Sequence, residues 1–203
     1  MSLVDLIAQA DERGLAASGL ACLDRCVPLL GGDDDDVLRP LWTSLVDGEA
    51  WGERVAKARA DLGEPGDADP DCDSDADPGF GPGSGASPDE QAAFLVRRML
   101  ATVPVESSAD ALRGWADACS VAALRIHELL DIAADGTSSV AARREGRTDG
   151  MSPLVAAELR RQIAILELLA DRGAGGLRLV LGQSTEGRRV VRAVVSRRAR
   201  GRA

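Results

Sequence analysis

Apolar residues recur along the segment 107–134 at steps that alternate between three and four. They are Leu112, Trp115, Cys119, Ala122, Ile126, Leu129 and Ala133. This spacing places them on one face of an α-helix and is typical of the seam of an antiparallel bundle or coiled coil. Val121 and Leu124 lie on another side of the same helix. The segment therefore predicts a helix that is central in its bundle or that exposes an apolar patch.

Start and stop signals for helices frame most of the remaining chain. Ser87 with Glu90 forms a capping-box pattern around Pro88, and Gly173 follows a long apolar run as a stop signal. We therefore predict an all-α fold, a helical bundle of about seven helices. The predicted ranges are 3–13, 15–26, 37–47, 51–62, 88–103, 107–134 and 153–172.

Residues 64–87 are rich in Pro, Gly and Asp and show no periodicity. Such a composition buries too little apolar surface to offset the entropy of ordering, so we predict a disordered acidic linker. The linker divides the chain into an N-terminal short-helix segment (1–63) and a C-terminal helical bundle (88–173), followed by a basic tail (174–203). Whether the two helical segments share one core stays open at this point.

The basic tail has an ambiguous pattern. LRLVL is typical of a short strand, and a β-hairpin across GQSTEG is one interpretation. The four valines between 190 and 195 instead fall within one helical arc, with arginines opposite, although β-branched residues weaken that interpretation. Strand, hairpin and helix all remain open.

Charge is unevenly distributed along the chain. The net charge is −9, yet residues 177–203 carry eight Arg against Glu186 alone. Such a tail has the charge to bind nucleic acid. The candidate contacts are Arg188, Arg189, Arg192, Arg197, Arg198 and Arg200. Because the acidic remainder of the chain would repel phosphate, we favour a tail that clamps onto the protein's own acidic surface or is simply solvated.

Cys22 and Cys26 lie one helical turn apart and raise the question of a zinc or thiol-redox site. Such a site would need further ligands, and Cys119 and the single histidine, His127, are the candidates. The two cysteines also fall in a continuous apolar arc, where cysteine packs as a small hydrophobic residue. We therefore expect core packing and no bound metal or cofactor, with the zinc or thiol site kept as an alternative.

Catalytic motifs are not apparent. The sequence has no G-x-S-x-G, P-loop or dinucleotide-binding pattern, and one histidine with no tyrosine leaves few groups for acid–base catalysis near neutral pH. The N-terminus lacks the basic residues of a signal peptide, and no apolar run is long enough for a membrane span, so we expect a cytoplasmic protein. The sequence predicts a non-catalytic helical protein–protein interaction module, an adaptor or regulator that binds a protein partner or self-associates. A nucleic-acid-associated regulator is the first alternative.

Overall fold

The computed structural model describes residues 1–31, 37–62, 85–131 and 139–201. Their α-helices are α1 (Leu3–Gln9), α2 (Glu12–Cys26), α3 (Arg39–Asp47), α4 (Trp51–Leu62), α5 (Pro88–Ala101), α6 (Ala109–Leu130), α7 (Val140–Arg144), α8 (Pro153–Arg172) and α9 (Leu177–Gly201). Two 3-10 turns, η1 (Val27–Leu30) and η2 (Gly173–Gly176), follow α2 and α8. The predicted all-α class is confirmed for these residues. None of their helices has both the length and the apolar character needed to cross a bilayer.

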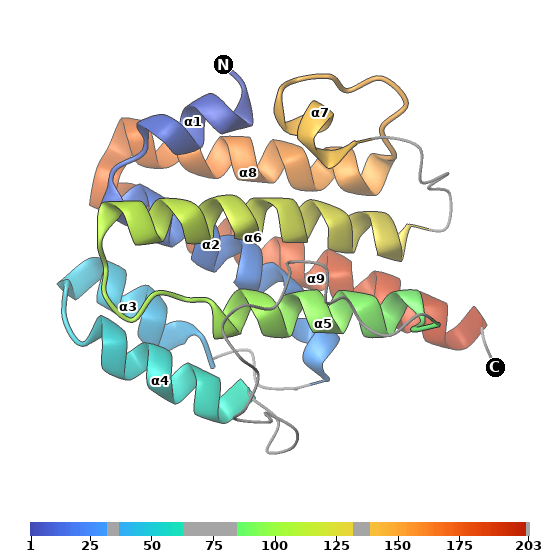
Figure 1. Ribbon diagram of the computed structural model, residues 1–203, viewed down its shortest axis with the longest axis horizontal. Coiled ribbons are helices and arrows are strands. Elements are labelled where there is room, and N and C mark those ends of the chain that lie inside the picture. Colours follow the sequence, from blue (N-terminus) through green and yellow to red (C-terminus); the bar gives the residue numbers. More distant parts are fainter. Residues whose placement is uncertain (32–36, 63–84, 132–138, 202–203) are drawn as a thin grey trace, which may run out of the picture.

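Helix α2 is the centre of the molecule. It contacts α6, α8 and α9, and almost all of its residues are buried (Figure 1). Helices α5 and α6 run side by side on one face, with α1 and α8 along one edge and α3 and α4 along the other. One continuous apolar core contains residues from both 1–62 and 88–191. The two helical segments therefore pack together within the described ranges. Most of the predicted linker, 64–84, lies outside those ranges.

Local capping signals place the helix starts. The Ser87 hydroxyl accepts the Glu90 N–H at 3.3 Å, and the Glu90 carboxylate accepts the Ser87 N–H at 2.7 Å, so the predicted capping box is formed. The predicted first helix, 3–13, is wrong at its end, because α1 ends at Gln9. The Asp11 carboxylate accepts the Gly14 N–H at 2.7 Å and caps α2, which begins at Glu12, and Gly14 lies inside that helix.

The strand and hairpin interpretations of the basic tail are wrong for the described residues, because 177–201 form α9. One side of α9 is buried at steps of three and four. The buried positions are Leu177, Val180, Ser184, Gly187, Arg188 and Val191. Ser184 and Arg188 are polar and Gly187 has no side chain, which hid the helical stripe in the sequence. Packing against α2 outweighs the weak helix propensity of the valines.

Gly187 allows the close approach of α9 to α2. A Cβ atom at this position would overlap the aliphatic part of the Arg25 side chain. The absence of a side chain at Gly187 thus makes room for an arginine in the core.

Candidate functional site

An apolar groove runs between α5 and α6, with a volume of about 630 Å³. Leu95 and Met99 line it from α5. Its α6 side includes the small residues Gly114 and Ala118 together with Val121, which is 38% exposed. Of the two apolar residues predicted to lie outside the seam of this helix, Leu124 is buried, whereas Val121 faces solvent.

Charged side chains stand along the edge of the groove. Arg98 lines it from α5, while Asp110 and Arg125 line it from opposite ends of α6. Asp110 accepts a hydrogen bond from Arg113 at 3.1 Å, and Arg125 donates one to Glu128 at 3.0 Å. The Asp110 side chain is 99% exposed and that of Arg125 52%, so both remain accessible from solvent.

Two tryptophans hydrogen-bond to backbone carbonyls of residues that line the groove. The Trp115 Nε1–H donates to the Met99 carbonyl at 3.0 Å, and the Trp51 Nε1–H donates to the Pro104 carbonyl at 2.7 Å. Their rings pack edge to face, with centroids 6.5 Å apart at 71°. These contacts tie α4, the end of α5 and α6 together.

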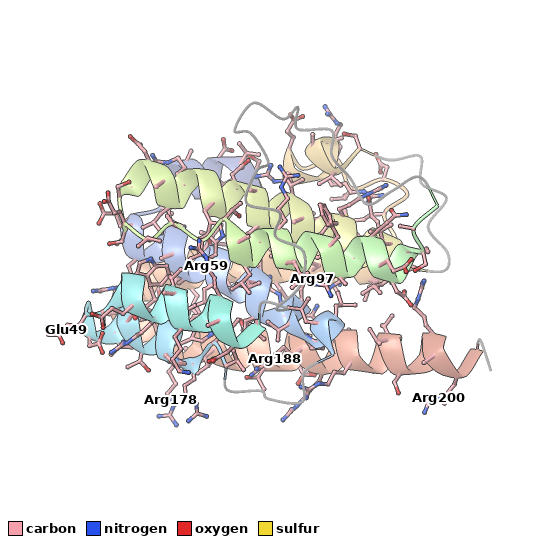
Figure 2. The ribbon with its side chains drawn as sticks, turned by 60° about the horizontal axis from the view of Figure 1, so that its bottom comes forward. Glu49, Arg59, Arg97, Arg178, Arg188 and Arg200 are labelled. Atoms are coloured by element: carbon pink, nitrogen blue, oxygen red, sulfur yellow. The ribbon has the colours of Figure 1, made fainter. Side chains whose placement is uncertain are left out.

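Arginines from other helices cap the C-terminal ends of both groove helices. Arg59 of α4 donates to the carbonyls of Leu100, Ala101 and Val103 at 3.3, 2.7 and 2.6 Å, and Figure 2 shows it between α4 and α5. Arg198 of α9 donates to the last carbonyls of α6 at 3.1 and 3.3 Å. Positive charge at a helix C-terminus satisfies free carbonyls and is favoured by the helix dipole. Both walls of the groove are therefore fixed from outside.

A second polar feature lies inside the core. Glu158 of α8 accepts hydrogen bonds from Arg25 of α2 at 2.5 and 3.0 Å and from Gln162 at 2.9 Å. Ser120 of α6 donates to Gln162 at 2.7 Å. His127 Nε2 stands 3.7 Å from Glu158, and its Nδ1–H donates to the Ala123 carbonyl at 2.7 Å. This cluster connects α2, α6 and α8.

Burial and pairing set the ionisation of this cluster. Burial acts to raise the pKa of Glu158, but the Arg25 charge, the nearby His127 and the hydrogen bonds from Arg25 and Gln162 together outweigh it and lower that pKa to about 2. Burial lowers the pKa of His127, in spite of the nearby Glu158 carboxylate. Burial acts to lower the pKa of Arg25, yet the Glu158 charge, the hydrogen bonds to Glu158 and the neighbouring Cys22 and Cys26 together raise it above its usual value. The cluster is thus an arginine–carboxylate ion pair next to a neutral histidine.

The cluster has little room for chemistry. The void beside Cys22, Ser120 and Gln162 measures about 10 Å³, which is about the space for one water molecule. Arg25 and Glu158 are at most 1% exposed. We therefore interpret the cluster as a structural network of polar contacts that holds α2, α6 and α8 together.

The candidate thiols lie in the core. Cys22, Cys26 and Cys119 are free and buried. Burial raises the pKa of Cys22 to about 12 and raises those of Cys26 and Cys119 well above their usual range. Arg25 donates a weak hydrogen bond to the Cys22 sulfur at 3.5 Å. These thiols are therefore protonated at neutral pH, unlike reactive cysteines.

Metal ligation finds no support in the described part of the chain. No group of three or more His, Cys, Asp or Glu side chains there is arranged to hold a metal ion. His127 instead contacts Glu158 and the Ala123 carbonyl. The fourth cysteine, Cys72, lies outside the described residues.

The candidate nucleic-acid contacts are spread over different environments. Arg188 is buried and lies 3.5 Å from Asp24, and Arg198 pairs with Asp89 at 3.1 Å. These two arginines therefore hold α9 against α2 and α5. Arg192 is half-buried. Arg189, Arg197 and Arg200 are exposed, and Figure 2 shows Arg200 projecting near the end of α9. Contact of these residues with nucleic acid remains an untested prediction.

Sequence reasoning missed the buried cluster. Glu158 and Gln162 lie four residues apart and in phase with the buried Val155, Ile165 and Leu169 of α8. Polar residues on an otherwise apolar helical face are the signal that was available, because they must find buried partners. The partner on α2, Arg25, has no comparable signal.

Comparisons with protein-family models, with curated proteins and with solved structures find no match to this chain.

Proposed function

We propose that this chain is a cytoplasmic, non-catalytic protein–protein interaction module, an adaptor or regulator, that accepts an α-helix of its partner in the groove between α5 and α6. The observation that carries the proposal is the groove itself, an open apolar channel of about 630 Å³ between two helices. Helix-in-groove recognition uses such a surface, with apolar side chains of the bound helix in the channel.

The chemistry of the groove fits a helix. Its α6 side consists largely of small residues such as Gly114 and Ala118, which let another helix approach closely. Charged residues at the edge of the groove would orient a bound helix, while the apolar floor would bury the apolar side chains of that helix. Because both walls are capped and tied to neighbouring helices, little conformational entropy is lost on binding.

A photo-crosslinking amino acid placed at Ala118 tests the proposal in cells that normally make the protein. Ala193 on α9 is the matched control, since it is also an exposed helical alanine but lines none of the described cavities. We expect a discrete protein adduct from position 118, identified by mass spectrometry, that position 193 does not give. The same adducts from both positions, or none from position 118, would refute the proposal.

A further inference from the structure

We propose that the helix seated in this groove is α6 of a second copy of the chain, so that two copies form an antiparallel, two-fold symmetric dimer about an axis near Ala118. This inference rests on the proposed function and names the partner. It follows from the order of charges and side-chain sizes along the open face of α6.

The open face of α6 is narrow and continuous. At 100° per residue, Asp110, Gly114, Ala118, Val121 and Arg125 fall within an arc of about 80°. Each of these residues is exposed and lines the groove. A helix lying along this arc would therefore meet all five residues at once.

The same face is complementary to itself when one copy is reversed. Asp110 and Arg125 lie equally far on either side of the point between residues 117 and 118, and so do Gly114 and Val121. A two-fold axis at that point places Asp110 of each copy opposite Arg125 of the other. It also places the exposed Val121 side chain over the bare backbone of Gly114. Both pairs form twice, as symmetry requires.

The structure leaves room for this contact. A Cβ atom at Gly114 would meet nothing within 4 Å in the single chain, so the space above Gly114 is open. Leu95 and Met99 of α5 stand beside this space and would flank the incoming helix. The dimer would then join α5 and α6 of each copy as four helices, with the dipoles of the paired α6 helices opposed.

Charge-swap variants test the register by sedimentation equilibrium. We expect the native chain to show a monomer–dimer equilibrium. Asp110→Arg or Arg125→Asp alone places like charges together at both symmetric positions, and we expect the dimer Kd to rise by about tenfold to thirtyfold. The double variant Asp110→Arg/Arg125→Asp restores opposite charges, so its Kd should return to within about threefold of the native value. Circular dichroism checks that each variant folds.

Glycine variants separate the dimer from the fold. Gly114→Ala replaces a glycine on the exposed face of a helix by a better helix former, so the single chain should gain thermal stability. The added methyl group would meet Val121 of the other copy, so the dimer Kd should rise. Gly182→Ala is the matched control, since Gly182 is an exposed helical glycine on α9 with equally open surroundings. It should stabilise the chain similarly and leave the dimer Kd unchanged.

The results distinguish this inference from the function on which it rests. A chain that is monomeric at all concentrations, or a dimer whose Kd is the same in the native chain and in the charge-swap variants, overturns the antiparallel α6 contact. If position 118 then crosslinks to a different protein, the groove remains an interaction site with another occupant. A self-adduct from position 118 together with rescue by the double swap supports both proposals.

Discussion

Replacing Glu158 by Gln removes the negative charge that the buried Arg25 requires, with almost no change in side-chain volume. Glu158 is fully buried, and Arg25 is 1% exposed. The guanidinium would keep its charge but lose the carboxylate that holds it at 2.5 and 3.0 Å. The expected result is a large loss of folding free energy, since breaking a buried ion pair from one side leaves the other charge unpaired.

The size of this loss follows from the pKa of Glu158. Its pKa falls from 4.5 to about 2 on folding, and a shift of this size corresponds to about 3 kcal/mol at neutral pH. Loss of one member of a buried pair typically costs about 3–5 kcal/mol. Because the pKa is lower in the folded state, this stabilisation is present above pH 4.5 and is lost as the pH falls toward 2.

Urea unfolding measures the effect, with circular dichroism as the signal and the m-value as a check on two-state behaviour. We expect Glu158→Gln to lower the free energy of unfolding by about 3 kcal/mol at pH 7. The difference in free energy of unfolding between the variant and the native chain should shrink steadily below pH 4.5. Arg25→Met/Glu158→Gln, which removes both charges, should be less destabilised than the two single variants predict together. A loss below about 1 kcal/mol at pH 7, or a difference that does not shrink in acid, would refute the reasoning.

Three further perturbations probe other parts of the core. Burial lowers the pKa of His127, so the folded state resists protonation of this side chain. The free energy of unfolding of the native chain should therefore decline as the pH falls below 6.5. In His127→Gln, urea unfolding should no longer show this part of the pH dependence. The pKa of the Cys22 thiol is about 12, so iodoacetamide should modify Cys22 only after unfolding in urea, as peptide mass spectrometry would show. A Cβ atom at Gly19 would lie 2.6 Å from the Trp115 ring, so Gly19→Ala should lose about 1–3 kcal/mol of unfolding free energy, and an unchanged urea midpoint would contradict the packing.

Periodicity and capping residues predicted the fold where local signals were strong. Residues 153–172 have a serine cap at the start and a glycine at the end, and α8 has these limits. Residues 107–134 were predicted from their apolar stripe, and α6 covers 109–130. Local sequence is sufficient in such segments because caps and core face agree.

The sequence was less informative where charged residues are buried. In α9, Arg188 occupies a core position because Asp24 of α2 lies beside it, and no local pattern indicates a partner 164 residues away in the chain. Arg25 is hidden in the same way, since nothing around it on α2 indicates its partner, whereas Glu158 at least lies in phase with the buried residues of α8. The groove is likewise a property of two helices at once, although the exposed Val121 was already visible as an apolar residue outside the seam.

Helix α6 contributes residues both to the buried polar cluster and to the open groove. On its inner side, Ser120 and His127 reach the buried cluster, while Glu128 and the half-exposed Asp117 pair with arginines of α7. On its outer side, the face centred on Ala118 lines the groove. A helix held on its inner sides by directional polar contacts has little freedom to rotate or shift, so its outer face keeps a fixed register. If a helix binds there as proposed, small residues and a few charges on that face would be enough to specify one arrangement, since affinity depends less on added contacts when the surface is already ordered.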